Sequence, residues 1–232
     1  MNFNSFDVLT FDCYGTLIDW EAGILRTLTP VLAAHGVRVA PDELLELYGK
    51  FEAEEEKGEY RTYKAIQSAL MAKIGEHFQF TPTDGELTCL SDSIQHWLPF
   101  PDTIGALKVL HKRYKLAIIS NVDDDLFVAT EKRLHTKLDW VITAEQVQSY
   151  KPSRNNFLKA IERMGIPKER ILHVAQSIFH DIVPAKELGL STVWVNRRHS
   201  QGGFGATPPA HQRADVIVPD LRSLSRLTGM SA

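Results

Sequence analysis

The sequence predicts an α/β protein with a doubly wound, Rossmann-like core around a parallel sheet and an inserted helical cap. Three observations lead to this fold class. An apolar run over residues 8–11 ends in Asp12, as expected of a buried strand that reaches the edge of a sheet. Residues 20–98 contain helical stripes of apolar side chains and no convincing strand. From Pro99 onward, short apolar runs alternate with helices, which favours a parallel sheet covered on both faces.

The elements are predicted in order from the spacing of apolar residues. Helices of the cap are expected around residues 24–32, 44–51, 63–74 and 87–97, with prolines near their edges. Helices of the core are expected over 104–114, 127–134, 157–164, 185–188 and 221–227. Strands are expected over 8–11, 116–119, 140–142, 171–175, 192–195 and 216–218. The core therefore comprises residues 1–18 and 99–232, and the cap comprises residues 19–98.

Two further segments are distinguished by composition. Residues 52–57 form a charge run, which we interpret as a solvated helix face rather than part of a site. Residues 199–212 are rich in Gly and Pro, which predicts a surface loop.

Composition argues against several classes of function. The chain has 232 residues, a net charge of −3 and no basic stripe, so nucleic acid is not an expected partner. The absence of a run of eighteen apolar residues and of a signal peptide argues against a membrane partner and favours a cytoplasmic protein. Cys13 and Cys89 form no disulfide framework or metal-ligand pattern. Apolar cap residues serve either packing or a homodimer interface, and the sequence leaves that choice open.

Polar side chains occupy four positions near the strand ends of the predicted core. They are Asp12, Ser120 with Asn121, Lys151 and Asp181. The carboxyl ends of parallel strands meet at one edge of a sheet, so we expect these side chains in one crevice. Taken singly, each has a structural alternative, as a turn residue, a surface lysine or a helix cap. The ordered set favours a catalytic site.

The residue types predict covalent catalysis by a carboxylate. Asp12 would be ionised at neutral pH and would attack an electrophilic centre to form an ester or an acyl phosphate. Thr16 would orient this carboxylate, and Lys151 would keep it ionised. Ser120 and Asn121 would donate hydrogen bonds to a substrate carboxylate or phosphate. The acid at the fourth position would hold the lysine or position the water that cleaves the intermediate.

The order of these motifs resembles the haloacid dehalogenase superfamily, whose members have an Asp nucleophile, a Ser or Thr, a Lys and a final acidic motif. That family also inserts a helical cap after its first strand, so the resemblance covers nearly the whole chain. Tyr14, two residues after Asp12, resembles the type II 2-haloacid dehalogenase branch. The resemblance implies a catalytic set of Asp12, Thr16, Lys151 and Asp181. It also implies a substrate site that comprises Tyr14, Arg61, Ser120, Asn121, Phe157 and Gln176.

Two departures from the phosphatase motifs of this superfamily favour carbon–halogen cleavage. Most of its phosphatases carry a second Asp where this chain has Tyr14, and that acid protonates the leaving alkoxide, whereas a halide leaves without a proton. Their last motif usually begins Gly-Asp, but this chain has Ala175-Gln176, which removes a carboxylate from the Mg²⁺ site. We therefore expect no metal cofactor, with Mg²⁺ on Asp12, Tyr14 and Asp181 as the alternative.

Other positions depart from the dehalogenase pattern. Those enzymes typically have an Arg in the region of the second cap helix that helps to hold the halide. In this chain either Arg61 or Lys50 replaces it, or nothing does. Phe157 stands where the family has a Tyr, so it keeps the ring and loses the hydroxyl. In the last motif, Gln176 and Ile178 stand where the family usually has Ser and Asn.

Three hypotheses about function follow. The leading one is a hydrolase that acts as a 2-haloacid dehalogenase on a small anionic substrate, through an ester on Asp12. The second is a Mg²⁺-dependent phosphatase of small molecules that forms an aspartyl-phosphate. The third is a non-catalytic binding module on the same fold. Sensitivity to EDTA separates the two enzymes, and the substitution Asp12→Asn separates both from the binding module.

Overall fold

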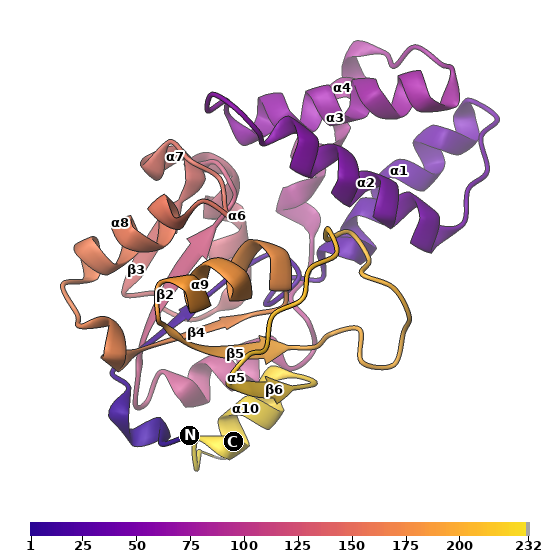
Figure 1. Ribbon diagram of the computed structural model, residues 1–232. Coiled ribbons are helices and arrows are strands. Elements are labelled where there is room, and N and C mark those ends of the chain that lie inside the picture. The colour runs from indigo at the N-terminus through magenta and orange to yellow at the C-terminus, as the bar shows by residue number, and fades with distance from the viewer. Residues whose placement is uncertain (231–232) are drawn as a thin grey trace.

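The computed structural model describes residues 1–230 and confirms the predicted α/β fold (Figure 1). Six parallel strands form one sheet in the order β3-β2-β1-β4-β5-β6, and every predicted strand is present. Strand β1 lies between β2 and β4, so the residues that follow these three strands meet at one edge of the sheet. The strands are β1 (Val8–Phe11), β2 (Lys115–Ser120), β3 (Trp140–Thr143), β4 (Ile171–Ala175), β5 (Ser191–Val195) and β6 (Val216–Val218).

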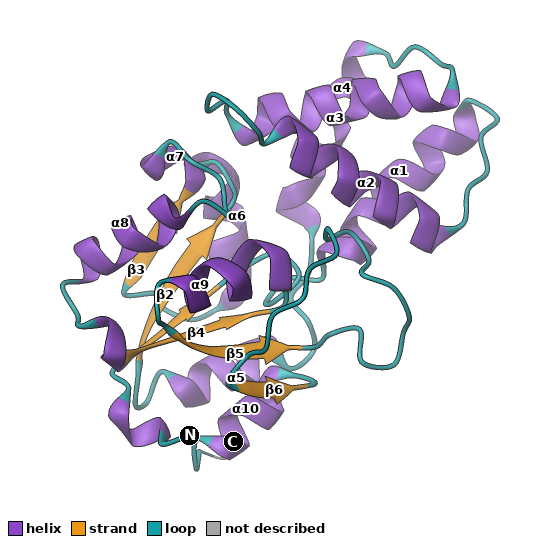
Figure 2. Cartoon of the chain, in the orientation of Figure 1, coloured by secondary structure: helices purple, strands orange, loops and turns teal. Residues whose placement is uncertain are grey.

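Helices cover both faces of the sheet (Figure 2). Helices α8 and α9 pack against one face, and α5, α6 and α10 contribute apolar residues to the core on the other. The core helices are α5 (Thr103–Leu110), α6 (Asp124–Leu134), α7 (Ala144–Val147), α8 (Arg154–Met164), α9 (Val183–Glu187) and α10 (Leu221–Leu227). Helix α7 is not among the predicted helices, and a π-helical turn at Ile178–Ile182 precedes α9. Short 3-10 turns lie at Phe3–Ser5, Ile94–His96 and Lys168–Arg170.

Four helices form the inserted segment, which lies beyond the carboxyl edge of the sheet (Figure 1). They are α1 (Trp20–Ala34), α2 (Pro41–Glu55), α3 (Tyr63–Phe78) and α4 (Asp84–Ser93), and they match the four predicted cap helices. Pro41 starts α2 at a position where its missing N–H costs nothing, and Thr83 and Glu86 form a capping box at α4. The exact limits of core and cap stay a prediction. No helix within residues 1–230 is long and apolar enough to cross a membrane.

The loop between β5 and β6, residues 196–215, fastens the helical segment to the core, and we call it the crossing loop. The Arg198 guanidinium donates to Glu21 of α1 at 2.6 Å and to Asp42 of α2 at 2.9 Å. A side chain at Gly49 of α2 would meet the Ala206 carbonyl at 2.5 Å, so only glycine permits this close approach. The prediction of a surface loop over 199–212 is therefore wrong in its central part, because this part packs against the helical segment.

Candidate active site

The turn after β1 presents Asp12 at the carboxyl edge of the sheet. Gly15 has a φ of +92°, a conformation that glycine adopts without strain, and it allows the tight turn. Thr16 Oγ1 donates a hydrogen bond to Asp12 Oδ2 at 2.6 Å and accepts one from the Gln176 backbone N–H at 2.9 Å. The carboxylate is therefore oriented by its own turn and by the chain that follows β4.

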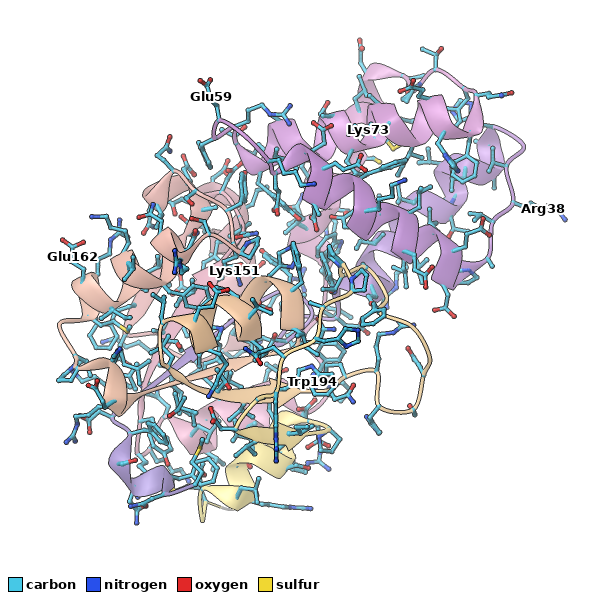
Figure 3. The ribbon with its side chains drawn as sticks, viewed as in Figure 1. Arg38, Glu59, Lys73, Lys151, Glu162 and Trp194 are labelled. Atoms are coloured by element: carbon cyan, nitrogen blue, oxygen red, sulfur yellow. The ribbon has the colours of Figure 1, made fainter. Side chains whose placement is uncertain are left out.

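Lys151 joins the two acids of the predicted catalytic set. Its Nζ donates to Asp12 Oδ1 at 2.8 Å, to Asp181 Oδ1 at 2.7 Å and to the Ile119 carbonyl at 2.9 Å. These three bonds use every proton of the ammonium group. Burial lowers the pKa of Lys151, but attraction to the two carboxylates outweighs burial and raises it. Lys151, labelled in Figure 3, is therefore a permanent positive charge beside both acids.

Asp181 has a second donor on the same oxygen. His173 Nε2 lies 3.0 Å from Asp181 Oδ1, and His173 Nδ1 lies 2.9 Å from the Thr10 hydroxyl, so β1 and β4 together orient the imidazole. Burial raises the pKa of Asp181, but the Lys151 charge and the His173 hydrogen bond outweigh burial and lower it. Burial also raises the pKa of Asp12, and there the Lys151 ammonium offsets burial only in part. The two acids therefore differ in how firmly the protein holds them ionised.

Glu52 of α2 faces the site from the helical segment. Its side chain is 3% exposed, and its Oε1 accepts hydrogen bonds from Tyr63 at 2.6 Å, Tyr48 at 2.9 Å and Gln67 at 3.1 Å. Burial raises the pKa of Glu52 to about 7, although these three donors act in the opposite direction. The interpretation of 52–57 as a solvated face is therefore wrong for Glu52, because α2 turns this carboxylate inward, whereas Glu54 and Lys57 are exposed.

Glu56 follows one helical turn later and meets the core directly. Its two carboxylate oxygens accept from Asn121 Nδ2 at 3.1 and 3.3 Å, and its side chain is 6% exposed. His180 Nε2 lies 3.9 Å from Glu56 Oε2. Burial raises the pKa of Glu56 well above its ordinary value, and the neighbouring Glu52 carboxylate adds to the effect. Asn121 therefore contacts a cap carboxylate and also binds the Lys151 backbone.

A cavity of about 30 Å³ lies between the sheet edge and the helical segment. We call Asp12, Ser120, Asn121, Lys151 and Asp181 the core wall of this cavity, and Glu52, Glu56 and Tyr63 its cap wall. The remaining lining residues are Tyr14, Trp20, Gln176, Ser177, His180 and Thr207, the last from the crossing loop. A carboxylate beside a buried ammonium in a small cavity is suited to covalent hydrolysis.

Comparison with known proteins agrees with this chemistry. The sequence pattern of haloacid dehalogenase-like hydrolases matches residues 6–189. The chain belongs to the haloacid dehalogenase-like hydrolase family. The (S)-2-haloacid dehalogenases of Pseudomonas fluorescens and Pseudomonas putida are each 30% identical to it, over 93% and 94% of both chains. The structure of the L-2-haloacid dehalogenase of Xanthobacter autotrophicus has a TM-score of 0.78 at 21% identity, covering 97% of this chain and 98% of that one. The predicted family is therefore confirmed.

The structure of this haloacid dehalogenase-like hydrolase brings most of the predicted site residues together. Seven of them line the cavity: Asp12, Tyr14, Ser120, Asn121, Lys151, Gln176 and Asp181. Thr16 lies behind Asp12 and contacts it directly. Motif order alone therefore located the residues around the carboxyl edge of the sheet, and their catalytic roles stay a prediction.

Two predicted substrate contacts lie elsewhere. Arg61 bonds to Glu55 at 2.5 Å with its side chain 44% exposed, and Lys50 is exposed, so neither lines the cavity or replaces the halide-binding Arg of the family. Phe157 is fully buried among the residues that α8 packs against the sheet, and it lies edge-on to His173 at 5.0 Å between ring centres. Phe157 therefore supports the histidine behind Asp181 instead of touching a substrate.

The carboxylates leave few free oxygens for the alternative Mg²⁺ site. Asp12 Oδ1 and Asp181 Oδ1 both accept from the Lys151 ammonium, so both of these oxygens are already engaged. Asp12 Oδ2 is bonded to Thr16, which leaves Asp181 Oδ2 as the free carboxylate oxygen of this pair. Within residues 1–230, no group of three or more His, Cys, Asp or Glu side chains is arranged to hold a metal ion.

Sequence reasoning missed the cap wall, although one signal was present. Leu45, Tyr48, Glu52 and Glu56 are spaced by three, four and four residues, so all four lie on one face of a helix. The two glutamates therefore continue the apolar stripe of α2 toward the site. Thr207 carried no comparable signal, because its place in the cavity depends on the course of the crossing loop.

Proposed function

We propose that this hydrolase releases halide from short (S)-2-haloacids, with Asp12 as the nucleophile. Two dehalogenases of that specificity are 30% identical to the chain along nearly its whole length. The observation that carries the proposal is the position of Asp12, which is oriented by Thr16, paired with Lys151 and open to the cavity.

The reaction takes place in two steps. An oxygen of Asp12 attacks C2 of the substrate, the new C–O bond forms as the carbon–halogen bond breaks, and halide departs with the bonding electrons. Water then attacks the ester carbonyl on Asp12, which releases the 2-hydroxyacid with inverted configuration and restores the carboxylate. Asp181 Oδ2, which has no hydrogen-bond partner within the described chain, accepts one proton of this water and returns it to the C2 oxygen as the ester bond breaks. The other proton of the water is released as Asp12 ionises.

Tyr14 supports a leaving group that needs no proton. Its hydroxyl lies 2.9 Å from Thr130 Oγ1, and burial raises its pKa well above the ordinary value of 10. The phenol is therefore a poor acid at neutral pH, which suits halide and does not suit an alkoxide. Ser120 Oγ lines the same cavity without a hydrogen-bond partner in residues 1–230, and we assign it to the substrate carboxylate.

Halide release from (S)-2-chloropropionate in the presence of EDTA tests the proposal. We expect turnover by the wild-type protein and none by Asp12→Asn. Release that continues in Asp12→Asn would refute the nucleophile, and no release from any short haloacid would refute the function. Hydrolysis of small phosphate esters that requires Mg²⁺ would identify a phosphatase instead, and turnover of neither substrate class would identify a binding module.

A further inference from the structure

Acidic side chains outnumber cationic ones among the residues that line the cavity. Four carboxyl groups face it, from Asp12, Glu52, Glu56 and Asp181, whereas Lys151 is the one Lys or Arg side chain among its described lining residues. The ammonium of Lys151 gives all three protons to the core wall, so none is left for the cap wall. A substrate that is only an anion would therefore meet two further acidic side chains and find no cation in the cap wall.

The cap wall has no cationic partner in the described part of the chain. Neither Glu52 nor Glu56 has a lysine or arginine nitrogen within 4.0 Å, and the nearest basic group, His180 Nε2, lies 3.9 Å from Glu56. Burial lowers the pKa of His180 to about 4, so this imidazole is neutral at pH 7. Its Nδ1 lies 3.1 Å from the Ser177 hydroxyl, and its Nε2 is bonded to nothing within residues 1–230.

The unbonded Nε2 is an observation independent of the acids. His180 is 8% exposed and lines the cavity, and buried polar atoms are nearly always hydrogen-bonded in folded proteins. In the tautomer that carries its proton on Nδ1, toward Ser177, Nε2 is an acceptor. The lining of the cavity then includes the carboxyl groups of Glu52 and Glu56 together with this acceptor of His180.

A primary ammonium group matches this set of acceptors. It has three N–H donors and one positive charge, and it would neutralise carboxylates that are costly to bury alone. Resting on the dehalogenase function above, we propose that the cap wall binds a protonated amino group, so that the preferred substrates are short 2-haloacids carrying an ammonium group on C3. The substrate carboxylate then meets Ser120, and the ammonium meets Glu52 and Glu56.

Two unreactive isosteres test recognition without turnover. β-Alanine and butyrate have the same shape, but the chain of β-alanine ends in an ammonium group and that of butyrate ends in a methyl group. NMR titration at pH 7.5 should show β-alanine binding at least tenfold more tightly than butyrate to the wild-type protein and to the control Glu46→Gln, an exposed position of the same helix. Glu56→Gln should lose most of this preference. Equal or tighter binding of butyrate, or a preference unchanged in Glu56→Gln, would overturn the proposal.

Glu52→Gln provides a second variant if Glu56→Gln does not fold, and the same loss of preference is expected. Turnover of 3-amino-2-chloropropionate against 2-chlorobutyrate separates this proposal from the function on which it rests. Faster release from 2-chlorobutyrate would overturn the ammonium site and leave the dehalogenase intact. Halide release from neither compound, with the β-alanine preference retained, would refute the dehalogenase and support the ammonium site.

Discussion

The core wall and the cap wall both contain buried acidic side chains, but only the acids of the core wall have a cationic partner. In the core wall, Asp12 and Asp181 share the Lys151 ammonium, which donates to Oδ1 of Asp12 at 2.8 Å and to Oδ1 of Asp181 at 2.7 Å. In the cap wall, Glu52 and Glu56 receive hydrogen bonds from neutral phenol and amide groups and have no ammonium or guanidinium within 4.0 Å in the described chain.

This difference suits the two walls to different roles, the core wall to catalysis and the cap wall to substrate recognition. A carboxylate paired inside the protein keeps its charge whether or not a ligand is bound, which a nucleophile requires. A buried carboxylate without a counter-charge is stabilised most when a ligand supplies a cation, which suits a recognition site. The core wall would then perform the hydrolysis, and the cap wall would determine which substrates bind.

The largest effect is expected from Asp12→Asn. An amide does not attack carbon, so halide release should fall by at least about 10³-fold. Ion chromatography of chloride measures it, with Asp125→Asn, an exposed position on α6, as the matched control. β-Alanine should still bind the Asp12→Asn variant, because the cap wall is unchanged. Halide release that persists in this variant would contradict the assignment of the reaction to the core wall.

Lys151→Met should produce the largest change in stability. It leaves two buried carboxylates without their shared cation, a loss that costs about 3–5 kcal/mol in other buried pairs. Urea unfolding at pH 7 measures the change, and Lys159→Met, an exposed lysine of α8, is the control. An unfolding free energy within about 1 kcal/mol of the wild type would show that the core wall does not depend on this ion pair.

The core wall was predictable because strand topology fixes it. The apolar run before Asp12 places that acid at the end of β1, and parallel neighbours bring Ser120 and Asp181 to the same edge. Few other arrangements of an alternating β/α sequence are available. The proximity of these residues was therefore predictable from strand order alone, without side-chain contacts.

The cap wall was not predictable in the same way. Charged residues on a helix are solvated in most proteins, and the burial of Glu52 depends on how α2 packs on the core. Phe157 was misplaced for a related reason, since an aromatic ring six residues after Lys151 reaches either the site or the core, depending on the rotation of α8. The burial of Glu52 and the rotation of α8 depend on tertiary packing, which cannot be deduced from a single sequence.

A smaller effect is expected from Glu52→Gln, as a change in the pH dependence of stability. The folded-state pKa of Glu52, about 7, lies above its ordinary value of 4.5. The contribution of protonated Glu52 to the free energy of unfolding is therefore fully present below pH 4.5 and is lost as the pH rises through 7. The loss amounts to about 3 kcal/mol. Urea unfolding at pH 5 and pH 8 should show a smaller fall in Glu52→Gln than in the wild type or in Glu46→Gln. An equal fall would show that Glu52 is not held in this way.

The smallest effect is expected from Arg198→Ala, which loosens the link between the two walls. Arg198 bonds to Glu21 and Asp42, but Asp42 has a side chain that is 77% exposed, so solvent weakens that pair. We expect about 1 kcal/mol of destabilisation, faster proteolysis within residues 199–212 and a raised KM at nearly unchanged kcat. A kcat that fell in parallel with stability would mean that the crossing loop orients Asp12 itself. A change confined to KM would mean that it holds the cap wall, with Thr207, against a core wall that is already complete.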